Sequence, residues 1–219
     1  YYAMCEWFDE TCGALMNHID KSGIAEDTLI IYVTDNGWIQ TETGSYGIRS
    51  KRSPYEGGTR NPIMFRWKGT IPPADRSELC SSIDFVPTVL AAAGAKGPHD
   101  FPGLNLLPEL KSGKKIKRDV LFGESFAHDI ADINNPEASL IFRWCITGKW
   151  KLLLTYDGEV NRYQSTHPRT EKRPQLFDLN ADPTELKNVA ADHPELVASM
   201  AAKIENWYPL TERKTITEF

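Results

Sequence analysis

The chain has 219 residues, of which 41% are hydrophobic and 25% are charged, so its composition is that of a globular protein and excludes a disordered or collagen-like chain. Its formal net charge of −5 gives no general reason to expect nucleic acid or an anionic membrane as a partner. The longest apolar runs are far shorter than the roughly 20 residues that cross a bilayer, so we expect no membrane span.

The first predicted element is a helix that starts at the first residues of the chain, without an N-terminal capping residue. Apolar residues recur at helical spacing from Phe8 to Ile19, and Gly23 is placed to end the helix. Tyr1 has neither a capping residue nor an initiator Met before it. We therefore expect a sequence that is entered in mid-protein, by truncation or by cleavage.

A buried strand follows this helix. Residues 29–33 form a continuous apolar, β-branched run, which is typical of a strand buried on both faces of a parallel sheet. The strand ends in the polar turn at residues 35–37, and this order of elements predicts an α/β fold. Residues 62–67 form a second candidate strand, and a short helix is expected from Asp84 to Leu90.

The residue composition changes after Gly97, where several prolines occur and a lysine-rich run follows. We expect a boundary there, with residues 98–219 forming a small α+β subdomain. Short strands are predicted at residues 120–123, 140–146, 150–156 and 175–179. Gly148 suits a tight turn in an antiparallel hairpin, and Asp192 and Pro194 predict the N-cap and first turn of a C-terminal helix.

The first candidate site lies at Asp35 and Asn36, directly after the predicted strand. Ligands of open α/β sheets bind beyond the carboxyl ends of strands, and carboxylate and amide oxygens suit Ca²⁺ or Mg²⁺. Asp-Asn-Gly is also an ordinary turn sequence, so the dipeptide by itself leaves both interpretations open.

The second candidate feature is a cationic segment. Residues 49–68 contain six cations and one acid, a local net charge of +5. Cations beside a metal-type carboxylate are what an anionic oxyester substrate needs, because they neutralise charge on the transferring group. The alternative is a solvated basic surface, but Pro54 and the pair Gly57-Gly58 interrupt the run and shape a defined loop.

Four ordered motifs closely resemble the second half of the type I sulfatase family, within the alkaline-phosphatase superfamily. They are Y-V-T-D-N-G at residues 32–37, K-R-S-P-Y-E-G-G-T-R-N-P at 51–62, D-F-V-P-T-V-L at 84–90 and Q-L-F-D-L-N-A-D-P-T-E-L-K-N at 175–188. The resemblance implies the C-terminal part of an alkaline-phosphatase-like α/β sandwich, with a small antiparallel sheet and a C-terminal helix. Residues 1–97 would then be the C-terminal portion of the catalytic α/β domain.

The resemblance also implies roles for particular residues. Asp35 and Asn36 match two ligands of a divalent ion, Ca²⁺ in preference to Mg²⁺, and Lys51 matches the lysine that contacts the sulfate. The motif that contains Glu56 and Arg60 is architectural, and these two could hold the loop by charge-assisted bonds. His128 lies in a loop that can face the active-site mouth and could hydrogen-bond substrate, although an isolated surface histidine is the alternative.

The sequence departs from the family at the nucleophile. Sulfatases use a formylglycine made from Cys or Ser in a C/S-x-P-x-R motif, and this chain contains no such motif. The paired aspartates of the family's N-terminal region are also absent. We therefore expect half of an active site, a chain that is inactive by itself, and a missing N-terminal half of the same protein as its partner.

The sequence thus predicts a sulfuric ester hydrolase that cleaves a sulfated small molecule or carbohydrate. A phosphodiesterase or phosphonate monoester hydrolase of the same superfamily shares the metal chemistry and stays open. A non-catalytic remnant that serves as a binding module is the other alternative. The resemblance favours a periplasmic or secreted location.

Overall fold

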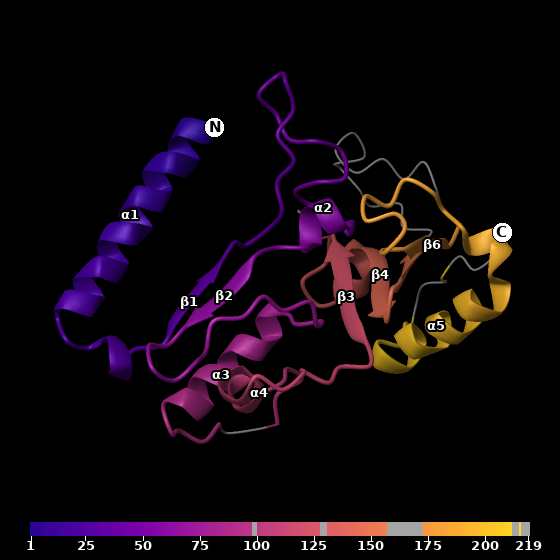
Figure 1. Ribbon diagram of the computed structural model, residues 1–219. Helices are drawn as coiled ribbons and strands as arrows, with labels where there is room; N and C mark the ends of the chain where they lie inside the picture. The colour runs from indigo at the N-terminus through magenta and orange to yellow at the C-terminus, as the bar shows by residue number, and fades with distance from the viewer. Residues whose placement is uncertain (98–99, 128–130, 157–172, 212–214, 216–219) are drawn as a thin grey trace. The chain divides into compact units, whose positions relative to one another are not determined.

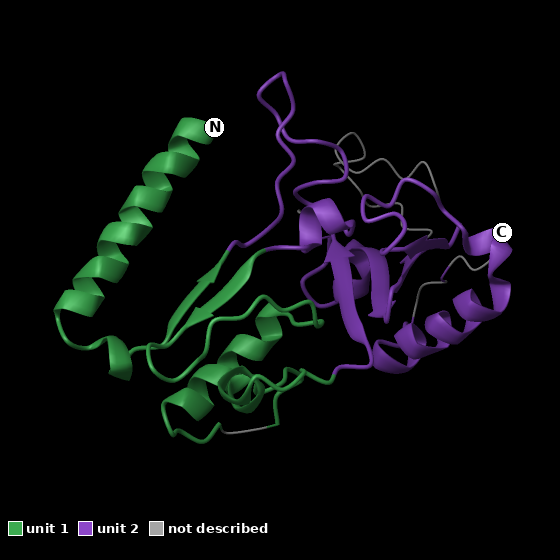
Figure 2. Cartoon of the chain, in the orientation of Figure 1, with its two compact units in different colours: residues 1–33, 62–117 green, residues 34–61, 118–219 purple. Residues whose placement is uncertain are grey.

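The computed structural model describes residues 1–97, 100–127, 131–156, 173–211 and 215 (Figure 1). These residues form two compact units, which Figure 2 distinguishes by colour. Unit 1 consists of residues 1–33 and 62–117, and unit 2 of residues 34–61 and 118–219. The expected domain boundary at residue 97 rests on a change in residue composition, whereas the two units are defined by contacts within the structure. That boundary stays a prediction. In the part of the chain so described, no helix is long and apolar enough to cross a membrane.

Unit 1 contains a two-stranded sheet and helices. Its main elements are α1 (Tyr2–Lys21), β1 (Ile30–Val33), β2 (Ile63–Arg66), α3 (Phe85–Ala92) and α4 (Leu107–Ser112). The predicted N-terminal helix, both strands and the helix after Asp84 are therefore present. Strand β1 pairs with β2, with Ile30 opposite Arg66 and Val33 opposite Ile63.

The predicted environment of β1 is wrong. The pairing of β1 with β2 is antiparallel rather than parallel, and the residues of β1 are half-buried or exposed rather than buried on both faces. Among the described residues β2 is the only neighbour of β1. An apolar run records a tendency to be buried but not the direction of the neighbouring strand, which explains the error.

Unit 2 is built on a four-stranded antiparallel sheet with the strand order β3-β4-β5-β6. Its elements are α2 (Glu56–Thr59), β3 (Leu121–Phe126), β4 (Leu140–Thr147), β5 (Trp150–Thr155), β6 (Gln175–Asp178) and α5 (Pro194–Trp207). All four predicted strands are present. Gly148 has a φ of +57° in the turn between β4 and β5, a conformation that glycine adopts without strain, so the predicted hairpin is confirmed.

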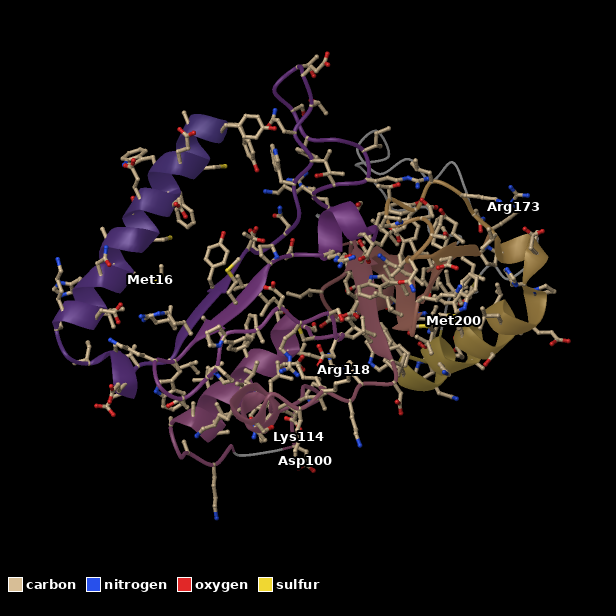
Figure 3. All side chains as sticks on the ribbon, viewed as in Figure 1. Met16, Asp100, Lys114, Arg118, Arg173 and Met200 are labelled. Atoms are coloured by element: carbon tan, nitrogen blue, oxygen red, sulfur yellow. The ribbon has the colours of Figure 1, made fainter. Side chains whose placement is uncertain are left out.

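One face of this sheet is covered by α5. Cys145, Leu152 and Leu176 lie in register on adjacent strands and form one buried cluster with Met200 and Ile204 of the helix. Figure 3 labels Met200 on α5. Burial of this cluster removes apolar surface from water and is the main stabilising contribution of unit 2.

The opposite face of the sheet is covered by the segment that contains α2. The Tyr55 hydroxyl donates a hydrogen bond of 2.8 Å to Oε1 of Gln175, and the Tyr55 ring lies 6.1 Å from that of Phe177. Because both faces are covered, β4 and β5 are buried along almost their whole length. The sheet therefore supports the segment around Tyr55.

The start of α5 differs from the prediction in one detail. Pro194 occupies the first turn as expected, but the N-cap is His193 rather than Asp192, and no side chain caps the helix. Asp192 instead ends a short 3-10 turn, Ala190–Asp192, that precedes the helix. The extra turn displaces Asp192 from the capping position.

Candidate functional site

The site is organised around three glycines in unit 2, which we call the glycine knot: Gly37, Gly57 and Gly58. The Gly37 N–H donates a hydrogen bond of 2.8 Å to the Gly58 carbonyl. A Cβ on Gly37 would lie 2.1 Å from the Gly57 oxygen, and one on Gly57 would lie 2.3 Å from the Arg49 oxygen. Only glycine permits such close backbone approach. The loop after β1 and the cationic segment are therefore packed against the same glycine pair.

Asp35 and Asn36, the two predicted metal ligands, lie directly before this knot. Asp35 is exposed, and its carboxylate has no hydrogen-bond or ion-pair partner among the described residues. The Asn36 side-chain nitrogen donates to the Gly37 carbonyl at 2.8 Å, which leaves its oxygen available as an acceptor. Both residues thus offer hard oxygens of the type that Ca²⁺ prefers.

These two residues fit only part of a calcium shell. Ca²⁺ takes about six to eight oxygen ligands, and two side chains cannot supply them. Within the described ranges, no group of three or more His, Cys, Asp or Glu side chains is placed to hold a metal ion. The remaining ligands of a calcium ion here would have to come from water, substrate or another segment.

Lys51, the predicted sulfate-binding residue, lies between Gly37 and Gly57 along the chain. It is half-buried, and its ammonium has no anionic partner within the described part of the chain. The backbone beside it is fixed by buried Ser50, whose hydroxyl accepts a 2.6 Å bond from the Ile39 N–H. A compact cation on a fixed backbone without a counter-ion is suited to binding an anion.

Arg49 supplies a second cation next to Lys51. Its guanidinium carbon lies 4.5 Å from the centre of the Tyr55 ring, in cation–π contact. Its Nη1 is buried and has no hydrogen-bond partner among the described residues. Sequence reasoning counted Arg49 among the cations but gave it no role.

Three buried charged residues join the knot to the sheet: Glu56, Lys151 and Glu185, which we call the buried triad. Lys151 lies on β5 with Nζ 2.8 Å from Oε1 of Glu56 and 3.1 Å from Oε1 of Glu185. The second Glu185 oxygen accepts a 2.5 Å bond from the Glu56 N–H. Burial raises the pKa of Glu185 above its usual value, and the Lys151 ammonium opposes that shift.

The expectation that Glu56 and Arg60 both hold the loop is half confirmed. Glu56 does so, through Lys151, whereas Arg60 is exposed and forms no ion pair within the described residues. Sequence reasoning missed Lys151 and Glu185. The available signal was a lysine within the apolar run of β5, since a buried charge requires a partner, but the sequence does not say which.

Trp38 follows the candidate metal ligands along the chain, and His128 is the predicted substrate-binding histidine. Trp38 lies 5.2 Å from the Tyr46 ring and donates its indole N–H to Gln40, so it is anchored within its own loop while part of the ring stays exposed. His128 lies outside the described residues.

The described residues offer oxygen ligands toward a cation and a lysine toward an anion, but no activated nucleophile. The sequence lacks the C/S-x-P-x-R motif. The one buried cysteine among the described residues is Cys145, and burial raises the pKa of its thiol to about 12. At neutral pH this thiol is protonated and packed in the core.

Comparison with known proteins finds similarity to sulfatases. The family model described as Sulfatase matches residues 1–95. The chain is 29% identical to Arylsulfatase K of Xenopus laevis over 208 residues, which are 94% of this chain and 36% of that protein. It is 30% identical to Arylsulfatase A of Homo sapiens over 211 residues, which are 88% of this chain and 40% of that protein.

Solved structures show the same likeness. A structure determined in complex with its substrate D-glucosamine-2-N,6-O-disulfate superposes with a TM-score of 0.68 at 25% identity and covers 91% of this chain and 37% of that one. The expected α/β fold, with a small antiparallel sheet and a C-terminal helix, is thereby confirmed. The chain spans between a third and a half of the length of the curated relatives named above.

Proposed function

Since the chain is similar to sulfatases over nearly its whole length, we propose that the protein hydrolyses sulfate esters and that this chain supplies the cation- and sulfate-binding part of the active site. The nucleophile would come from a segment that carries the C/S-x-P-x-R motif. Residues 1–219 by themselves would then be inactive.

Asp35 and Asn36 would hold a divalent cation, Ca²⁺ in preference to Mg²⁺, through their side-chain oxygens. When bound, such an ion supplies positive charge that stabilises developing negative charge on the reacting group. Lys51 would bind a sulfate oxygen and hold the ester in place, and it would stabilise the same charge from a second direction. The glycine knot supports this assignment because it packs both loops against one backbone support.

One observation carries the proposal beyond sequence similarity. Lys51 is a half-buried cation with no anionic partner among the described residues, on a segment fixed against the knot that follows Asp35 and Asn36. Lys151, the fully buried lysine of the same unit, is by contrast paired with Glu56. A half-buried lysine without an anionic partner among the described residues, on a segment packed against the glycine that follows Asp35 and Asn36, supports a role in binding an anionic ligand.

We further propose that the ester is carried by a sulfated small molecule or carbohydrate. One similar structure was solved with a disulfated glucosamine as its substrate, and a relative of 28% identity is an N-acetylgalactosamine-6-O-sulfatase of Bacteroides thetaiotaomicron. The partly exposed ring of Trp38, next to the candidate metal ligands, could pack on a sugar or aryl ring.

The test is the Lys51→Ala variant in a protein that carries this chain together with a C/S-x-P-x-R segment. We expect turnover of an aryl sulfate to fall more than tenfold, which corresponds to about 1.4 kcal/mol of barrier. Lys149→Ala is the matched control, because Lys149 is a surface lysine paired with Asp178. Unchanged turnover in Lys51→Ala would remove Lys51 from the site. Faster cleavage of a phosphate diester than of the sulfate ester would favour the phosphodiesterase alternative.

A further inference from the structure

The buried triad is an unusual way to attach a loop to a sheet. Lys151 and Glu185 are fully buried, and Glu56 is nearly so. Every pair of the three is joined, because Lys151 contacts both carboxylates and Glu185 accepts the Glu56 N–H. The members are far apart in sequence: Lys151 and Glu56 differ by 95 in residue number, and Glu185 and Glu56 by 129.

Stability by itself does not explain the triad. Removing charged groups from water is costly, and a buried ion pair can often be replaced by apolar residues without loss of stability. Glu185 also has a φ of +57°, in the left-handed region that non-glycine residues seldom occupy. Such a conformation persists where the surrounding contacts determine it closely. The triad therefore specifies a geometry.

The geometry that it specifies is that of the glycine knot. Glu56 is the first residue of α2, and the two glycines that follow it complete the knot with Gly37. Fixing the Glu56 backbone and side chain thus fixes the surface against which the segments before Gly37 and around Arg49 are packed. The triad residues are not placed to touch substrate, so any effect on the reaction passes through the backbone.

A second buried cation on the same sheet provides a natural comparison. Arg143 on β4 is fully buried, but it bonds the hydroxyl of Tyr156, the carbonyl of Tyr208 and Oε2 of Glu205. Tyr156 directly follows β5, and Glu205 and Tyr208 lie at the C-terminal end of α5. Arg143 therefore holds the C-terminal segment, whereas Lys151 holds the knot.

We propose that Glu56, Lys151 and Glu185 are positioning residues through which the C-terminal sheet sets the placement of Lys51, Asp35 and Asn36 for sulfate binding. This inference rests on the proposed function for its consequence. The C-terminal sheet then contributes to the active site indirectly, through the backbone of the glycine knot, beyond completing the fold.

The test compares amide hydrogen exchange in Lys151→Met, Glu185→Gln and Arg143→Met within residues 1–219. Lys151→Met should speed exchange of the Glu56 and Gly37 amides at least tenfold relative to amides of β4. Arg143→Met should leave the ratio of knot to β4 exchange rates within about twofold of its wild-type value. The same substitution should speed exchange of the amides that follow α5. If the triad had a merely structural role, Lys151→Met and Arg143→Met would each speed amide exchange in the glycine knot and in β4 to the same extent. That result would overturn the proposal.

Glu185→Gln keeps the size of the side chain and an oxygen for the Glu56 N–H, so it decides the question if Lys151→Met does not fold. We expect several-fold faster exchange at Glu56 with β4 unchanged, and in the active protein a lower kcat with a smaller change in KM. Wild-type exchange together with wild-type kcat would refute the positioning role. If the wild-type protein cleaves no sulfate ester, the proposed function fails, while the exchange ratios still decide whether the triad positions the knot.

Discussion

The two units of the chain bury their apolar residues to very different extents. In unit 2 the sheet is covered on both faces, and Leu152, Leu176 and Ile204 are fully buried. In unit 1 not one of the 20 residues of α1 is buried, and Tyr2 and Trp7 are 77% and 71% exposed. The pattern of apolar residues predicted both helices equally well.

The spacing of apolar residues in the sequence therefore predicts where a helix forms, but it does not predict which surface packs against that helix. Helix α5 lies on a complete sheet, whereas α1 has few contacts within unit 1, among them the Phe8 and Tyr32 rings at 6.1 Å and the ion pair of Asp20 with Arg66. A large exposed apolar face marks an interaction site. The exposed apolar face of α1 is therefore expected to be a surface of association.

Two methionines give the sharpest version of this comparison, and the largest expected effect. Met200 of α5 is 1% exposed and Met16 of α1 is 38% exposed (Figure 3). We expect Met200→Ala to lower the free energy of unfolding of unit 2 by about 2–5 kcal/mol, because it leaves a cavity in the core. Met16→Ala should change stability by less than about 1 kcal/mol. Denaturant unfolding measures both, and equal losses would contradict the distinction.

The exposed face of α1 should also govern association. We expect residues 1–219 to self-associate, and Trp7→Ser to weaken that association several-fold, because a large apolar side chain is removed from the exposed face. Sedimentation velocity over a concentration series measures the effect. Ile133→Ser is the matched control, since Ile133 is an exposed apolar residue of unit 2 that lies outside any helix or strand. An equal effect of both substitutions would show that α1 is not the associating surface.

The smallest expected effect concerns Glu185, which faces Lys151 and Glu56. Burial raises the pKa of Glu185 in the folded state, so its protonated form is favoured by folding. The resulting stability is fully present below the unfolded-state pKa and is lost as the pH rises through the folded-state pKa. The unfolding free energy of wild type minus that of Glu185→Gln should therefore fall as the pH rises from about 4 to neutrality. A constant or rising difference would contradict the assignment.

The fold was predictable from sequence where apolar patterning is complete within the chain. The strands β3 to β6 and the helix α5 were all expected, and the register of β4, β5 and β6 buries the cluster around Cys145 and Leu152 against α5. The interpretation of residues 29–33 as a strand covered on both faces is wrong, because β1 is half-buried or exposed, whereas β4 and β5 are the strands that are covered on both faces. The sequence alone does not reveal which strand receives its covering layers.

The candidate site was predictable only in its local part. Asp35, Asn36 and Lys51 stand in short motifs, and the glycines beside them indicate close backbone approach. Lys151 and Glu185 belong to segments that are distant along the chain, so their meeting with Glu56 depends on the register of β5 and on the turn after β6. Patterns of nearby residues do not contain that information.

We propose that this chain carries the cation- and sulfate-binding part of a sulfatase site without its nucleophile. The most direct test is to measure calcium-dependent hydrolysis of an aryl sulfate by residues 1–219, by themselves and with an added sulfatase segment that carries the C/S-x-P-x-R motif. We expect no turnover by the chain alone and turnover that requires both Lys51 and the added segment. Calcium-dependent turnover by the chain alone, at a rate typical of an enzyme, would contradict the claim.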